Sequence, residues 1–258
     1  MTTTSLHVEF PGADGQRLAA RLEQPSDSPR AQAIFAHCFT CSKDIAAATR
    51  ISRALAERGF AVLRFDFTGL GNSEGDFGST NFTSNVQDLT AAADYLRAEH
   101  HAPALLVGHS LGGAAVLAAA GSIPEVRAVA TLGAPSDPEH VKHLFGQELE
   151  EEIRRTGEGT VRLGNAEFKI RRQLLEDLET QRLTACIAKL DAALMVMHSP
   201  EDDIVDIDHA RRICAAARHP KNFISLDGAD HLLSSRRDSE YVAELLACWS
   251  GRYLPAPA

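Results

Sequence analysis

The sequence predicts one α/β domain with a mostly parallel sheet, helices on both faces and an antiparallel hairpin at its N-terminal end. Short, continuously apolar segments alternate with longer amphipathic ones, as buried parallel strands alternate with their connecting helices. The first two strand-like segments instead alternate apolar and polar residues, which indicates strands with one exposed face. The 258 residues, 44% of them hydrophobic, suffice to bury the core of such a domain.

The predicted elements follow in order along the chain. An N-terminal hairpin is expected at 5–10 and 17–23, around a turn rich in glycine and proline. The further strands are the short apolar segments at 31–36, 60–65, 103–107, 126–132, 192–197 and 222–226. The helices are the segments with apolar residues at helical spacing, at 45–57, 86–99, 111–120, 206–217 and 241–253. Ligands of such sheets bind beyond the carboxyl ends of the strands, so catalytic residues are expected directly after strands.

Residues 137–191 separate two predicted strands by more than a crossover helix requires. Within them, 140–156 and 171–184 are predicted to be helical, and 159–170 has a hairpin pattern around Gly164 and Asn165. An insertion after the carboxyl end of a strand is well placed to act as a lid over a site, although a surface insertion without function is the alternative. The predicted organisation is therefore a core at 1–136 and 192–254, a lid or cap insertion at 137–191 and a linker-like tail at 255–258.

Composition excludes several classes of function. The formal net charge of −9 offers no general attraction for nucleic acid or anionic lipid. The N-terminal sequence lacks the pattern of a targeting signal, and no apolar segment approaches the length of a membrane span. Five cysteines, an odd number without framework spacing, predict free thiols in a reducing compartment, so a cytoplasmic protein is expected. The sequence does not indicate an oligomeric state.

The pentapeptide Gly108-His109-Ser110-Leu111-Gly112 has the pattern G-x-S-x-G between a predicted strand and a predicted helix. A sharp turn there exposes the central hydroxyl at a helix N-terminus, where backbone N–H groups favour negative charge. The flanking glycines allow the two chain segments to approach each other. The pentapeptide alone is a weak signal, and the strand before it and the helix after it strengthen it. Ser110 is therefore the candidate nucleophile, and a structural serine in a tight turn is the alternative.

A serine hydroxyl becomes a good nucleophile only beside a base. The last two predicted strands are each followed by a loop with candidates, Asp202, Asp203 and Asp206 in the first loop and His231 in the second. His231 would take the serine proton, and a carboxylate would orient the imidazole and stabilise its cation. The residues alone do not select among the three carboxylates, and a surface histidine is the alternative for His231.

With these motifs the sequence resembles the α/β-hydrolase superfamily over nearly its whole length. Residues 198–205 resemble the family's H-G-x-x-D-x-x-V motif, and residues 228–231 resemble its G-x-D-H motif. The resemblance implies an α/β-hydrolase fold with a serine nucleophile elbow and a Ser-Asp-His order of the catalytic triad. It assigns the acid to Asp202, with Asp203 as the next candidate.

A narrower resemblance rests on the stretches AHCFTCSKDI, RFDFTGLGNSEGDF and GAPSDPEHV. They are similar to the hydrolase half of bacterial fusion proteins that carry an OsmC-type peroxide-reductase domain behind it. In such a fusion the linker would begin near Tyr253. This resemblance does not name a substrate.

The resemblance also implies an oxyanion hole made of two backbone N–H groups, those of Phe39 and Leu111. Cys38 stands where the family has glycine, which leaves the assignment to Phe39 less secure than the triad. Cys38 and Cys41 form a C-x-x-C sequence, whose thiols can be redox-active. A thiol-based, redox-regulated module is therefore an alternative function.

The predicted function is a serine esterase that cleaves carboxylic ester or thioester bonds of small acyl substrates through an acyl-enzyme. Peptidase, acyltransferase and perhydrolase chemistry would use the same residues, and a non-catalytic ligand-binding protein of this fold is a further alternative. His140 and His143 have H-x-x-H spacing, but no third ligand is evident, so no metal and no cofactor are expected.

Overall fold

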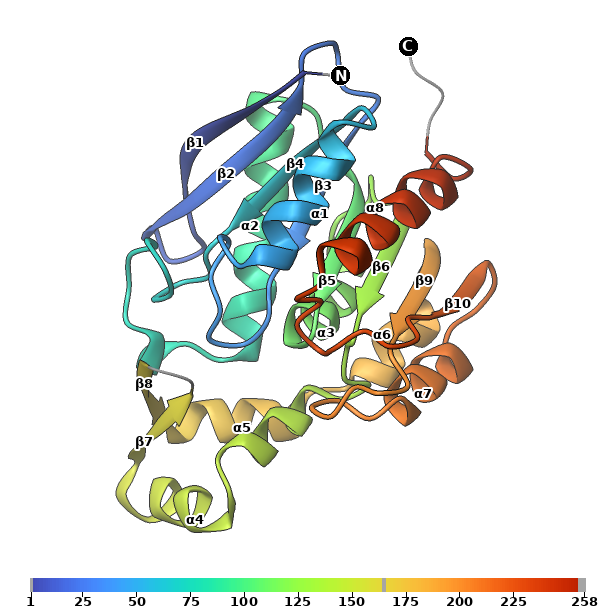
Figure 1. Ribbon diagram of the computed structural model, residues 1–258. Helices are drawn as coiled ribbons and strands as arrows, with labels where there is room; N and C mark the ends of the chain where they lie inside the picture. The colour runs from blue at the N-terminus through green and yellow to red at the C-terminus, as the bar shows by residue number, and fades with distance from the viewer. Residues whose placement is uncertain (1, 164–165, 255–258) are drawn as a thin grey trace.

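The computed structural model describes residues 2–163 and 166–254 (Figure 1). Eight strands form one sheet in the order β1-β2-β4-β3-β5-β6-β9-β10. The first two strands of the sheet form an antiparallel hairpin, and β2 also pairs antiparallel with β4. From β4 to β10 all neighbouring strands are parallel. The predicted mostly parallel sheet with an N-terminal hairpin is confirmed.

The strands of the main sheet are β1 (Thr3–Pro11), β2 (Arg17–Pro25), β3 (Ala31–Ala36), β4 (Phe60–Phe65), β5 (Pro103–His109), β6 (Ala128–Leu132), β9 (Ala193–His198) and β10 (Lys221–Ser225). The α-helices are α1 (Ala46–Ala56), α2 (Phe82–Glu99), α3 (Leu111–Ala119), α4 (Gln147–Thr156), α5 (Arg172–Thr180), α6 (Leu183–Lys189), α7 (Asp208–Ala216) and α8 (Arg236–Ser250). A second sheet pairs β7 (Glu158–Leu163) with β8 (Ala166–Arg171), and the short 3₁₀ helices are η1 (Phe77–Ser79), η2 (Ala120–Ser122) and η3 (Pro138–Leu144).

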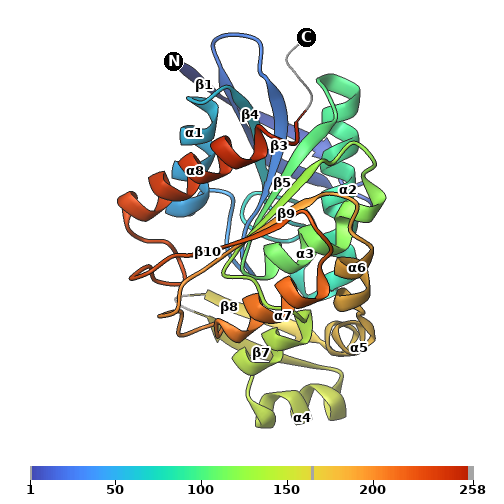
Figure 2. The ribbon, with the colours of Figure 1, turned by 90° about the vertical axis from the view of Figure 1, so that its right-hand side faces the viewer.

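Helices cover both faces of the main sheet, and successive strand residues serve opposite faces. Leu105 and Val107 of β5 belong to the core shared with α1 and α8, whereas Leu106 belongs to the core shared with α2 and α3. Figure 2 shows α1 and α8 on one side of the sheet and α2, α3, α6 and α7 on the other. Both faces of the central strands are therefore buried, which is why their sequences are continuously apolar.

Two helices begin earlier than predicted. Helix α2 starts at Phe82 because a capping box precedes it: the Asn81 side chain accepts the N–H of Ser84, and the Ser84 hydroxyl accepts the N–H of Asn81. Helix α8 starts at Arg236, and its first turn is charged and polar, so it adds nothing to the apolar pattern.

The predicted insertion is broken into more elements than expected. The helix expected over 140–156 is η3 followed by α4, interrupted at Gly146, whose φ of 73° is readily reached by glycine. The expected hairpin is present as β7 and β8, while Gly164 and Asn165 lie outside the described residues. The helix expected over 171–184 is α5 and α6, separated by an extended Gln181.

The elements of the insertion occupy two places. Helix α6 packs against α3 and α7, so it serves as the crossover helix between β6 and β9. The remaining elements, η3, α4, β7, β8 and α5, lie together beyond one end of the main sheet (Figures 1 and 2). Lys142 of η3 joins them, because its Nζ lies 3.0 Å from a carboxylate oxygen of Glu139 and 3.1 Å from those of Glu150 and Glu179. The predicted tail at 255–258 lies outside the described residues. None of the helices in 2–163 and 166–254 is both long and apolar enough to cross a membrane.

Candidate active site

The turn between β5 and α3 holds the backbone of Ser110 in a conformation that residues other than glycine rarely adopt. Its φ is 54° and its ψ is −126°, and it immediately precedes the first residue of α3. Gly108 and Gly112, two residues before and two residues after Ser110, have to be glycine because other backbone atoms approach them closely. A Cβ on Gly108 would lie 2.3 Å from the carbonyl oxygen of Gly112, and a Cβ on Gly112 would lie 2.3 Å from that of His37. The sharp turn therefore presents the Ser110 hydroxyl at a helix N-terminus.

The structure brings the predicted serine, histidine and acid side chains together. The Oγ of Ser110 lies 3.0 Å from Nε2 of His231, so the hydroxyl can donate to that nitrogen. The Nδ1 of His231 lies 2.8 Å from Oδ2 and 3.0 Å from Oδ1 of Asp202, so the N–H on Nδ1 can donate to the carboxylate. The three side chains come from the turn after β5, the loop after β10 and the loop after β9. This is the geometry that a serine nucleophile, its base and an orienting acid require.

Asp202 is distinguished from its neighbours by its contacts. Its side chain is buried, and Oδ1 accepts the backbone N–H groups of Ile204 at 3.0 Å and Val205 at 2.8 Å. Burial raises the pKa of this carboxyl, but the hydrogen bonds from His231 and from the two backbone N–H groups outweigh that effect and hold the pKa below its ordinary value. Asp202 is therefore ionised at neutral pH. Asp206 instead accepts the N–H of Asp208, the first residue of the next helix.

Two contacts that sequence reasoning missed fix the loops of the acid and the histidine. Nε2 of the buried His198 donates to the carbonyl oxygen of Val205 at 2.7 Å, across the loop that carries Asp202. Oε2 of Glu201 accepts the N–H of Gly228 at 2.9 Å and so joins the acid loop to the histidine loop. No pattern in the sequence indicates either contact, because each depends on how two loops meet in space.

Phe39 and Leu111, the predicted oxyanion donors, both line the cavity that contains Ser110. Leu111 is the first residue of α3, where backbone N–H groups have no partner within the helix. Within the described residues, the N–H of Phe39 makes no hydrogen bond either. Both residues thus line the cavity, and neither backbone N–H has a hydrogen-bond partner in the described parts of the chain.

The loop that carries Phe39 is closed by a disulfide between Cys38 and Cys41. The expectation that all five cysteines are free is therefore wrong for these two, whereas Cys186, Cys214 and Cys248 are free. The physical reason is the tight turn between them, in which the N–H of Cys41 donates to the carbonyl of Cys38 at 3.2 Å. That turn brings the two Cα atoms to 5.4 Å, a usual separation for a disulfide. The cytoplasmic location stays a prediction.

The cavity above Ser110 has a volume of about 240 Å³ and a mainly apolar wall. Its lining residues are Phe39, Ser110, Leu111, Pro135, His140, Val141, His143, Leu144, Asp203, Ile204 and Val205. Leu144 and Ile204 are 40% and 47% exposed. Nε2 of His140 donates to the carbonyl oxygen of Ile204 at 2.9 Å and so connects the insertion to the loop after β9.

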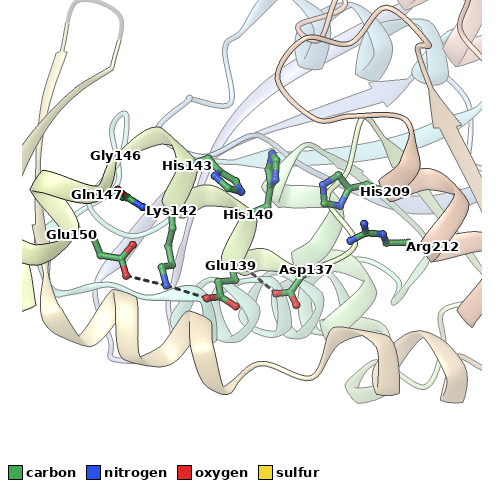
Figure 3. A pocket seen from close by; sticks show the side chains of 10 residues that line it. All are labelled: Asp137, Glu139, His140, Lys142, His143, Gly146, Gln147, Glu150, His209 and Arg212. Atoms are coloured by element: carbon green, nitrogen blue, oxygen red, sulfur yellow. Dashed lines mark hydrogen bonds and ion pairs between the residues drawn. The ribbon is translucent and has the colours of Figure 1, made fainter.

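A larger pocket of about 670 Å³ is lined by residues of η3, α4 and α7 (Figure 3). It shares His140 and His143 with the cavity above Ser110 but does not include the serine. Half of its lining residues are charged, and Figure 3 shows Lys142 between two of them, Glu139 and Glu150. No group of three or more residues able to hold a metal ion occurs in the described parts of the chain. The cavity above Ser110 is therefore the better candidate for substrate binding.

The chain is similar to a family of hydrolases in sequence and to solved hydrolase structures in fold. A family model described as serine aminopeptidase, S33, matches residues 27–144. The esterase domain of a Rhodothermus marinus protein is 51% identical, with a TM-score of 0.80 over 99% of this chain and 100% of that domain. The mitochondrial palmitoyl-protein thioesterase ABHD10 of Pongo abelii is 29% identical over 57% of this chain, and the match spans about half, 49%, of that relative. Mouse alpha/beta hydrolase domain-containing protein 10 is 20% identical, with a TM-score of 0.80 over 96% of this chain and 99% of that structure, which is a likeness of fold.

Proposed function

The chain belongs to the α/β-hydrolase family, and we propose that it is a serine esterase that cleaves carboxylic ester or thioester bonds through an acyl-enzyme on Ser110. The predicted α/β-hydrolase fold is confirmed by the solved structures that it resembles. The Rhodothermus marinus esterase domain, 51% identical over nearly the whole chain, supports chemistry on esters. The resemblance to fusions with an OsmC-type domain stays a prediction.

The observation that carries the proposal is the continuous hydrogen-bonded line from Ser110 through His231 to Asp202. In the first half of the reaction, the Ser110 oxygen attacks the acyl carbon while Nε2 of His231 takes the hydroxyl proton. Asp202 keeps the other proton of His231 on Nδ1 and stabilises the imidazolium. The N–H groups of Phe39 and Leu111 donate to the oxyanion of the tetrahedral intermediate.

Collapse of the first intermediate releases the alcohol or thiol, which takes its proton from His231. In the second half of the reaction, His231 removes a proton from water, and the resulting hydroxide attacks the acyl-enzyme carbonyl. The second tetrahedral intermediate then collapses, the proton returns to the Ser110 oxygen, and the carboxylic acid leaves. No metal or cofactor takes part in these steps.

The cavity above Ser110 indicates the kind of acyl group. Its volume of about 240 Å³ holds roughly eight heavy atoms if each needs the ~30 Å³ that a water molecule takes in the liquid. The apolar side chains of Val141, Leu144 and Val205 favour an unbranched or lightly branched hydrocarbon chain over a charged one. Two of them, Val141 and Leu144, come from the insertion, which we therefore propose to act as a cap that limits chain length and excludes water.

A fluorophosphonate probe tests the proposed nucleophile. The folded protein should form one adduct at Ser110, located by peptide mapping, because the probe reacts only with an activated serine. Ser110→Ala should form none, whereas Ser136→Ala, which removes another serine close to the insertion, should still react.

With p-nitrophenyl esters, kcat/KM should rise from acetyl to about octanoyl and fall for longer chains. A folded protein that forms no adduct and hydrolyses no ester or thioester would refute the proposal.

The Cys38–Cys41 disulfide favours a second, regulatory role for the loop that carries Phe39. The disulfide spans Phe39 and Thr40, and Thr40 has a φ of 57°, which an unconstrained threonine rarely adopts. A dithiol would reduce it by thiol–disulfide exchange, leaving two thiols in the loop and a disulfide in the reductant. The freed loop would hold the Phe39 N–H less well, and loss of one oxyanion donor costs about 10²–10³ in kcat in other enzymes.

Reduction with dithiothreitol is therefore expected to lower kcat about tenfold and to leave KM within about twofold, since the donor acts mainly in the transition state. Reoxidation should restore kcat. The double variant Cys38→Ser/Cys41→Ser should have the lower kcat under both conditions, and Cys186→Ser should respond like the unchanged protein. Equal kcat in the oxidised and reduced protein would exclude the switch.

A further inference from the structure

His109 is a buried histidine next to the proposed nucleophile. It is the last residue of β5 and is 1% exposed. Its Nε2 lies 2.7 Å from the backbone carbonyl oxygen of His231, which is 122 residues further along the chain. The sequence motif G-x-S-x-G places no demand on this position, so nothing in the motif explains a polar side chain there.

The contact fixes which nitrogen of His109 carries the proton. A carbonyl oxygen only accepts hydrogen bonds, so Nε2 must hold the hydrogen. Nδ1 is buried and has no partner among the described residues, so a second proton there would be an unpaired buried donor. Burial, together with the nearby His231, lowers the pKa of His109 to about 4. His109 is therefore a neutral donor over the whole neutral range.

A neutral ring is what the neighbouring imidazole requires. The ring centroids of His109 and His231 are 5.2 Å apart. In the proposed reaction, His231 becomes a cation each time it takes a proton, and a charged neighbour at that distance would oppose it. A neutral His109 does not oppose it, and it can remain in contact with the carbonyl through the cycle.

The carbonyl of His231 belongs to a loop rather than to a strand or helix. This loop follows β10, and Leu233 within it has a φ of 51°. The side chain of His231 must keep Nε2 at 3.0 Å from Ser110 while Nδ1 stays at 2.8 Å from Asp202. A displacement of about 1 Å in such an arrangement can cost about 10²-fold in rate. A contact from the end of β5 to the main chain of His231 restricts such a displacement of the imidazole.

We propose that His109 is a positioning residue: through its hydrogen bond to the His231 carbonyl it ties the catalytic imidazole to the strand that carries Ser110. The inference rests on the proposed hydrolase function and adds to it a residue outside the triad. It acts on His231, not on the substrate. Its loss should therefore slow the chemical steps and leave ground-state binding unchanged.

Two substitutions separate the hydrogen bond from the volume of the ring. His109→Phe keeps a ring but cannot donate, and it should lower kcat about 10- to 100-fold with KM within about twofold. His109→Gln places an amide N–H at a similar reach and should retain kcat within about threefold. Ile51→Val, a slightly destabilising change in the core beneath α1, should leave kcat unchanged and so controls for stability.

A second background tests whether His109 acts through His231. In His231→Ala, residual activity depends on the oxyanion donors and binding alone, so adding His109→Phe should lower it no further. The inference is overturned if His109→Phe keeps the original kcat, if His109→Gln loses as much as His109→Phe, or if the loss persists in the His231→Ala background. The proposed function fails separately, if the unchanged protein neither reacts with fluorophosphonate nor hydrolyses esters.

Discussion

Asp202→Asn is expected to lower kcat for ester hydrolysis about 10⁴-fold without unfolding the protein. Oδ1 of Asp202 accepts the N–H groups of Ile204 and Val205, and the oxygen of asparagine can keep both bonds. The amide nitrogen would then occupy the place of Oδ2, 2.8 Å from Nδ1 of His231. Because that nitrogen donates, Nδ1 would become an acceptor and the ring hydrogen would move to Nε2. The imidazole could then no longer take the proton of Ser110.

Asp203→Asn is the matched control, since Asp203 lines the cavity on the same loop but is not a partner of His231. We expect its kcat within about threefold of the original, and circular dichroism and thermal unfolding should show both variants folded. Steady-state rates with a short-chain p-nitrophenyl ester suffice for the comparison. Equal losses in the two variants would argue against Asp202 as the orienting acid.

Gly112→Ala is expected to prevent folding or to lower the free energy of unfolding by more than about 4 kcal/mol. The new Cβ would lie 2.3 Å from the carbonyl oxygen of His37 and 2.5 Å from that of Ala36. Both are backbone atoms at the end of β3 or in the loop after it, where the chain approaches α3, so no side-chain rotation relieves the overlap. The loss would come from separation of α3 from β3, which carries the proposed nucleophile away from the oxyanion loop.

Gly121→Ala provides the comparison, because a Cβ there meets nothing within 4 Å. Its urea midpoint should stay close to that of the unchanged protein, and its free energy of unfolding should change by less than about 0.5 kcal/mol. Soluble yield and urea unfolding of the two variants measure the difference. A Gly112→Ala protein as stable as Gly121→Ala would contradict the packing described for the turn after β5.

The locations of the strands along the chain and the positions of the candidate residues could be predicted from the sequence because both depend on local sequence patterns. Continuous apolar segments mark strands buried on both faces, and the strand-end rule led to Ser110 and His231 without any knowledge of distances. The choice of Asp202 needed the family resemblance. The structure adds a physical reason, since the turn that follows gives Oδ1 of Asp202 two backbone donors.

What the sequence could not predict depends on contacts between distant segments. The start of α2 needed recognition of the Asn81 capping box, which places the buried Phe82 at the first position of the helix. The Cys38–Cys41 disulfide depends on a turn geometry that composition does not report. His109 occupies a variable position of a motif, and its partner is a carbonyl group, which no side-chain pattern can reveal.

The way the insertion at 137–191, the proposed cap, joins the core has an evolutionary consequence for the proposed function. The chain leaves the core after β6 and returns through α6, and the intervening elements carry Val141 and Leu144 of the cavity wall but none of the three residues of the proposed triad. Under the proposed function, mutations, deletions or transplants in that segment are expected to alter the accepted acyl-chain length while the proposed catalytic residues stay fixed. Selection could then act on the preferred acyl-chain length and on the rate of bond cleavage as two nearly independent traits. A designer could likewise change the preferred chain length without rebuilding the residues proposed to cleave the bond.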